Sequence, residues 1–136
     1  LMAINPNTKV LDMGDLNDNP TDPSMVKVLK CVDKKEKCQP GGLYNPWVAY
    51  YNKGIGTLGY NDSWSLFDQI VLSSGWLDNK QTGYFFQKAL IFSRDFMITK
   101  TGKFKGYPKR TWDWAIYNAG YSDHFPTYLT FLQEVK

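Results

Sequence analysis

The stretch SLFDQIVLS, residues 65–73, decides the fold class that we expect for this chain. Its β-branched and aliphatic residues predict a buried strand, and comparable apolar runs lie at residues 8–13, 84–92, 96–99 and 127–132. The run carries one acid, Asp68, with apolar residues on both sides of it. An ionised carboxylate buried in a strand without a partner is strongly destabilising. We therefore expect Asp68 either to face solvent on an edge strand or to have a partner from another part of the chain.

One or two helices are expected beside these strands. Pro23 follows Asp22, a residue type that often caps helices, and apolar residues then recur at helical spacing at Met25, Val28, Leu29 and Val32. The basic run with Pro and Gly at residues 34–42 is typical of a helix end. A second, short helix is expected after Pro46. The mixture is dominated by strands, which favours an α/β or α+β fold.

Composition limits the class of protein. A chain of 136 residues is the size of a single domain, and an aromatic share of 16% indicates a globular core. The formal net charge of +3 is too small to indicate nucleic-acid binding by itself. Cys31 and Cys38 are interpreted as two ordinary thiols, although a disulfide stays open. The cysteines and many Asn and Tyr residues allow export, which we slightly favour over a cytoplasmic location, and the location itself stays open.

Polar residues at three strand ends stand out. Asp15 and Asn17 follow the first strand, Asp68 lies in the run described above, and Asp123 with His124, the only histidine, precedes the last strand. Each feature alone is more often a turn or a solvated edge. Taken together, they supply a carboxylate that can fix the tautomer of an imidazole and favour its cationic form. Acids with an amide and no thiolate cluster also suit a hard cation such as Mg²⁺.

Three motifs that contain these residues resemble those of a known family. GDLND at residues 14–18, LFDQIVLS at 66–73 and YSDHFP at 121–126 are similar, in order and spacing, to the C-terminal motifs of the endonuclease/exonuclease/phosphatase (DNase I-like) superfamily. The residue pattern of MGDLNDNP, residues 13–20, is similar to that of bacterial members of the Bacteroides type. The resemblance implies one half of a four-layer α/β/β/α sandwich, with a mixed, mostly antiparallel sheet and one or two covering helices. It covers residues 1–136 as a single, C-terminal part of that domain.

The resemblance also implies a role for each site residue. Asp15 would position or deprotonate the attacking water, and Asn17 would donate its amide to a phosphate oxygen and hold Asp15. Asp68 would pair with His124 and orient it, while His124 would hydrogen-bond the scissile phosphate. Asp123 and Asp15 would lie at the metal. The identity of the general base is left open.

The implied activity is the hydrolysis of a phosphodiester or phosphomonoester by in-line attack of water, in a metal-dependent phosphoesterase that is either a nuclease or a phosphatase. The metal would be Mg²⁺ or Mn²⁺, with its main Glu ligand in an N-terminal half outside these residues. Lys109 and Arg110 on a basic loop would attract the substrate, which could be DNA, a phospholipid head group or a small phosphodiester. The alternative is a degenerate, non-catalytic domain that binds a partner or a polyanion.

Half of a sandwich has a further consequence. A sheet that normally packs face to face would leave an apolar face open. We therefore expect the chain to bind the missing half or to self-associate through that face.

Overall fold

Strand β5 (Asp68–Ser73) is the centre of the fold in the computed structural model, which describes residues 1–77 and 83–133. It pairs antiparallel with β1 (Leu11–Asp15) on one side and with β2 (Leu43–Tyr44) on the other. Five of its six residues are buried, because neighbouring segments cover both of its faces. The apolar run thus forms the central strand that its composition predicts, although the strand begins at Asp68 rather than at residue 65.

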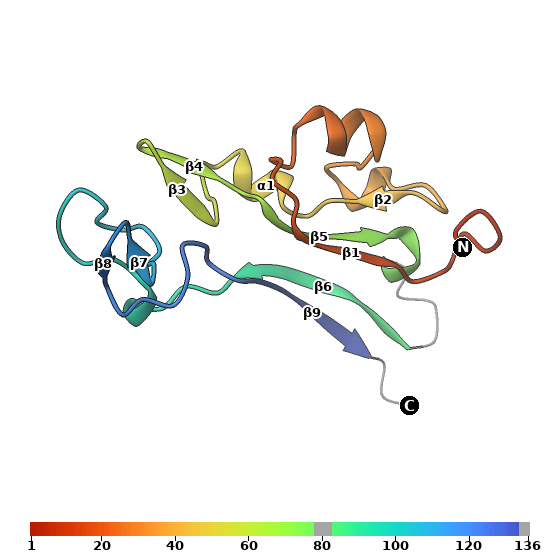
Figure 1. Ribbon diagram of the computed structural model, residues 1–136. Coiled ribbons are helices and arrows are strands. Elements are labelled where there is room, and N and C mark those ends of the chain that lie inside the picture. The colour runs from red at the N-terminus through yellow and green to blue at the C-terminus, as the bar shows by residue number, and fades with distance from the viewer. Residues whose placement is uncertain (78–82, 134–136) are drawn as a thin grey trace.

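A second layer lies against this sheet (Figure 1). Strands β6 (Tyr84–Ile91) and β9 (Thr127–Gln133) form a long antiparallel ladder with an irregularity between Phe86 and Lys88. The core between the layers is apolar and includes residues from both of them. Its buried members are Trp47, Leu66, Ile70 and Ala89, with Leu11, Tyr50, Tyr51, Phe86, Ile91 and Leu129 packed around them.

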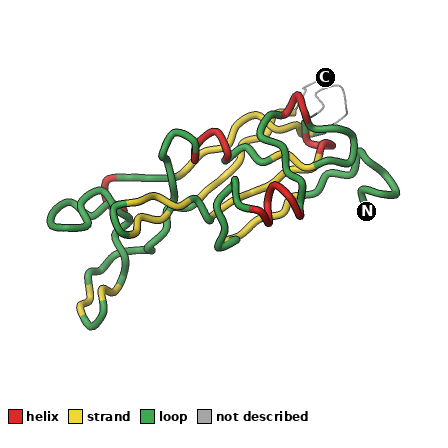
Figure 2. The backbone as a smooth tube through the Cα atoms, turned by 90° about the horizontal axis from the view of Figure 1, so that it is seen from above, coloured by secondary structure: helices red, strands yellow, loops and turns green. Residues whose placement is uncertain are grey.

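Two short hairpins form an arm at one end of the molecule (Figures 1 and 2). One hairpin joins β3 (Leu58–Tyr60) to β4 (Ser63–Ser65), and the other joins β7 (Trp112–Asp113) to β8 (Ile116–Tyr117). Aromatic rings connect the arm to the layers, since Trp64 contacts Tyr107 edge-on at 5.4 Å and stacks on Phe125 at 6.1 Å between centroids. Gly59 is required beneath this cluster, because a Cβ there would lie 2.7 Å from the Tyr107 ring.

The helices are short. The π-helical turn η1 (Ser24–Val28) and the α-helix α1 (Val48–Tyr51) accompany the 3₁₀ turns η2 (Lys35–Lys37), η3 (Ser74–Trp76) and η4 (Asp95–Met97). The predicted helix after Asp22 is therefore far shorter than its apolar pattern suggested, and of that pattern only Met25 is buried. Asp22 does not cap it, because its carboxylate accepts the backbone N–H of Asn19 instead. The helix after Pro46 is confirmed.

The helix after Asp22 stops early because its continuation is used in pairing. Lys30 adopts a left-handed φ of 55°, and Val32 then forms a parallel bridge to Tyr44 beside the central sheet. The strand predicted at residues 96–99 is also wrong, since η4 and an isolated bridge from Ile98 to Pro108 occupy it. The other predicted strands are present, with ends shifted by up to three residues.

The fold class is as predicted. The chain is a mixed α/β protein in which all the named strand pairs are antiparallel and the helices are few. Within residues 1–77 and 83–133, no helix is both long and apolar enough to cross a bilayer.

Candidate phosphoesterase site

Two carboxylates face each other where β1 ends and β5 begins. The register of this pair places Asp15 directly opposite Asp68. Directly opposed residues project from the same face of a sheet, so these side chains are neighbours. The Asp15 side chain is 43% exposed and the Asp68 side chain 21% exposed, so both can be reached from solvent. Like charges in such positions repel each other unless a cation or a donor lies between them.

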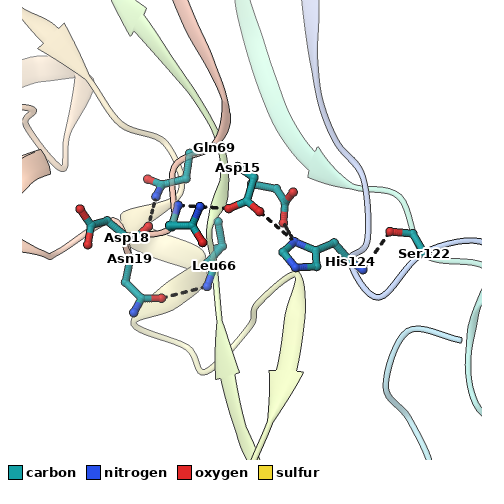
Figure 3. A network of polar contacts seen from close by, with 9 residues as sticks. Asp15, Asp18, Asn19, Leu66, Gln69, Ser122 and His124 are labelled. Atoms are coloured by element: carbon teal, nitrogen blue, oxygen red, sulfur yellow. Dashed lines mark hydrogen bonds and ion pairs between the residues drawn. The ribbon is translucent and has the colours of Figure 1, made fainter. Parts of the chain in front are cut away.

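His124 supplies that group (Figure 3). Its Nδ1 lies 2.8 Å from a carboxylate oxygen of Asp68 and 4.0 Å from one of Asp15, and the side chain is 20% exposed. Its backbone N–H donates to the hydroxyl of Ser122 at 3.1 Å, which shapes the turn before β9. An ionised Asp68 can only accept a hydrogen bond, so Nδ1 carries a proton and donates a hydrogen bond to Asp68. The other ring nitrogen, Nε2, is then the atom available to a substrate.

The loop after β1 brings Asn17 to this end of the sheet. The backbone N–H of Asn17 donates to a carboxylate oxygen of Asp15 at 3.1 Å. Asn17 has a left-handed φ of 53°, a conformation that Asn tolerates better than most residues. The backbone of Asn17, an exposed residue, is therefore held next to Asp15.

Asp123, Lys109 and Arg110 line a groove of about 1270 Å³ in the arm. The groove extends to Tyr121 and Asp123 of the YSDHFP segment. The backbone N–H of Tyr121 donates to the Lys109 carbonyl at 2.9 Å, which joins this segment to the one that carries Lys109. A Cβ at Gly120 would lie 1.9 Å from that same carbonyl, so the close approach requires glycine. The predicted substrate-binding cations thus share one groove with Asp123, whereas Asp15, Asp68 and His124 meet at the sheet end.

The described residues do not form a complete metal site. Within residues 1–77 and 83–133, no group of three or more His, Cys, Asp or Glu side chains is arranged to hold a metal ion. Asp68 and His124 bind each other, and Asp15 holds the Asn17 backbone. These residues therefore do not by themselves fit the metal that the motifs imply, and no chemical step is assigned to it. The roles of Asp15 and Asp123 as metal ligands stay predictions.

A comparison with known families supplies independent information. The chain matches the model of the Endonuclease/Exonuclease/phosphatase family over residues 1–133. The chain belongs to this family. No curated protein and no solved structure matched it. Membership of this family indicates, at a coarse level, a hydrolase of the phosphoesterase or nuclease type that acts on phosphate esters. Members of the family commonly use divalent metals.

Sequence reasoning missed the residues that support the loop after β1. Asn45 and Gln69 are both fully buried, and Gln69 hydrogen-bonds to Asn45 and to the Asp18 carbonyl. Separately, the Asn19 side chain accepts the N–H of Leu66 (Figure 3 labels Asp18, Asn19 and Gln69). The available signal was a second polar residue, Gln69, directly after Asp68 in an apolar strand.

Proposed function

We propose that the protein hydrolyses a phosphate ester by in-line attack of water at the end of β1 and β5. The observation that carries the proposal is the placement of the His124 imidazole, 2.8 Å from Asp68 and 4.0 Å from Asp15. An imidazole held at Nδ1 by a carboxylate presents Nε2 in one tautomer and orientation. When the ring is doubly protonated, Nε2 can donate to an oxygen that gains charge during the reaction.

The proposed mechanism gives each side chain a separate task. Asp68 orients His124 through Nδ1, and Nε2 of the doubly protonated imidazole donates to a phosphoryl or leaving-group oxygen. Asp15 positions the attacking water and accepts its proton, since its carboxylate is the more exposed of the two. The side-chain amide of Asn17 donates to a second phosphate oxygen. A dependence on Mg²⁺ or Mn²⁺ belongs to the same proposal, and its support is the family alone. Asp15 and Asp123 would each need further ligands, because the described residues form no complete metal site.

The groove in the arm supports a role for Lys109 and Arg110 in attracting substrate. Lys100, which also lines the groove, is already paired with Asp95 at 3.1 Å. In the described part of the chain, Lys109 and Arg110 form no salt bridge, so their charges are available to an anion. DNA, a phospholipid head group and a small phosphodiester all meet this requirement.

A binding module is the second candidate. The observation that favours it is the lack, among residues 1–77 and 83–133, of a set of three metal ligands. A degenerate domain of this kind would use the same cationic groove to hold a polyanion or an acidic partner without hydrolysing it.

Hydrolysis of two chromogenic esters distinguishes these candidates. The complete protein is incubated with bis-p-nitrophenyl phosphate or with p-nitrophenyl phosphate, in Mg²⁺, in Mn²⁺ and in EDTA. The enzyme proposal predicts release of p-nitrophenol above a buffer blank in metal and its loss in EDTA. Release that is equal in metal and in EDTA would contradict metal dependence. No release from either ester, together with saturable binding of an oligonucleotide, would favour the binding module.

A further inference from the structure

Strand β5 presents different polar groups on its two faces. Asp68 and Gln69 are consecutive, so their side chains point to opposite faces of the sheet. Asp68 faces His124 on the side of the site. Gln69 is fully buried, and its hydrogen bonds go to Asn45 and Asp18 rather than to His124 or Asp15. A buried amide with no part in the proposed chemistry requires its own explanation, because burial of polar groups is unfavourable unless they are paired.

Both ends of the Gln69 amide are engaged. Its Oε1 accepts from Nδ2 of Asn45 at 2.7 Å, and its Nε2 donates to the backbone carbonyl of Asp18 at 2.6 Å. Oδ1 of Asn45 in turn accepts the backbone N–H of Trp47 at 3.0 Å, and Asn45 is also fully buried. This chain of hydrogen bonds fixes which end of each amide is the donor. It connects the core at Trp47 to the loop that follows β1.

The same loop is attached at two further points to the residues just before β5. The backbone N–H of Leu16 donates to the Phe67 carbonyl at 2.9 Å, and Oδ1 of Asn19 accepts the N–H of Leu66 at 2.9 Å. Asn17 lies between these attachments in its left-handed conformation. Gln69 therefore makes the central contact, from the core side, with the segment that carries Asn17 and adjoins Asp15.

We propose that Gln69 is a positioning residue, which holds the loop so that Asn17 and Asp15 have fixed places relative to Asp68 and His124. The proposal rests on the phosphoesterase function proposed above. Gln69 contacts the loop through the Asp18 carbonyl and touches no reacting group, so it acts only through the loop's geometry. A displacement of about 1 Å in a reacting group can lower a rate by about a hundredfold. Loss of Gln69 should thus lower kcat more than it changes KM.

The test compares Gln69→Leu with Ser73→Ala in the complete protein. Ser73 is a matched control at the other end of β5, because it is equally buried and also makes two hydrogen bonds, to the Thr8 carbonyl at 2.7 Å and from the Val10 N–H at 2.8 Å. We expect both variants to unfold at lower denaturant concentration than the wild type. Below their unfolding transitions, Gln69→Leu should lose about ten- to a hundredfold in kcat for bis-p-nitrophenyl phosphate, with KM within a few-fold. Ser73→Ala should keep the wild-type kcat.

Wild-type kcat in folded Gln69→Leu, or an equal loss of kcat in Ser73→Ala, would overturn the proposal. If Gln69→Leu does not fold, Gln69→Met is used instead, since methionine has a length similar to that of glutamine and cannot donate to Asp18, and it should show the same loss of kcat. NMR relaxation of the wild type supplies a test without activity. The amides of Asn17, Asp18 and Asn19 should have order parameters like those of β5, about 0.85, and values below about 0.6 would overturn the inference. An inactive wild type refutes the phosphoesterase function instead, and leaves the NMR result to decide the positioning.

Discussion

Asp68→Asn should separate the activity of the site from the stability of the fold. The substitution keeps the size of the side chain but removes the charge that binds His124 Nδ1 at 2.8 Å. An amide presents either an acceptor or a donor to that nitrogen, and the donor orientation would stabilise the wrong imidazole tautomer. The His124 ring would then be less well held in the orientation that directs Nε2 toward the substrate.

The structure sets the size of the two effects. A hydrogen bond to a charged group contributes about 1.5–3 kcal/mol, and about 1.4 kcal/mol corresponds to a tenfold change in rate. The kcat for phosphate-ester hydrolysis should therefore fall by about ten- to a hundredfold. The free energy of unfolding should change by less than about 1 kcal/mol, because the substitution also removes the repulsion between Asp68 and the directly opposed Asp15.

The assay combines p-nitrophenol release from bis-p-nitrophenyl phosphate with urea unfolding of the same samples. Asp33→Asn is the control, because it makes the same chemical change in an exposed ion pair, 3.1 Å from Lys37 and remote in sequence from the site. Such exposed pairs contribute little, so this variant should match the wild type in both measurements. An Asp68→Asn variant with unchanged kcat would refute the proposed orientation of His124.

Three further predictions concern the groove, the arm and the thiols. Replacing Lys109 and Arg110 together by Ala should raise KM for an anionic substrate several-fold with little change in kcat. This increase in KM should be smaller in 0.5 M salt, and an unchanged KM at low salt would contradict the role of these two residues. Gly59→Ala should lower the free energy of unfolding by about 1–3 kcal/mol in urea titrations, because the added methyl group meets the Tyr107 ring, and a neutral result would contradict this contact. Burial, with a smaller effect of Asp12, raises the pKa of the free Cys31 thiol from 9.0 to about 11. At pH 8, iodoacetamide should therefore react with Cys31 about a hundredfold more slowly in the native protein than in the unfolded protein. The neutral thiol then stabilises the fold below about pH 9, and this contribution is lost as the pH rises toward 11; native Cys31 that reacts as fast as unfolded Cys31 would contradict the shift.

Much of the site could be predicted because its residues interrupt simple patterns. Asp68 interrupts an apolar strand. The order of the GDLND, DQIVLS and SDH motifs predicted that it contacts His124, which lies 56 residues further along the chain. The hydrogen bond expected between these two side chains is present. The strands were predictable for a related reason, since a buried central strand requires a continuous apolar run.

The parts that failed depend on contacts that no local pattern encodes. Residues Met25 to Val32 have helical spacing, but pairing of Val32 with Tyr44 beside the sheet overrides that preference. The arm consists of two-residue and three-residue strands, which are too short to produce a periodic signal. The Gln69–Asn45 contact joins two buried amides 24 residues apart, and only the folded chain brings them together.

The central claim is that His124 acts on a phosphate ester at the end of β1 and β5. The most direct measurement is the rate of bis-p-nitrophenyl phosphate hydrolysis in Mg²⁺ by the complete protein and by its His124→Ala variant, with circular dichroism to verify that both are folded. We predict hydrolysis well above the buffer blank for the wild type, and a rate lower by about two to three powers of ten, close to the blank, for the variant. A folded His124→Ala variant that hydrolyses the ester at the wild-type rate would contradict the account.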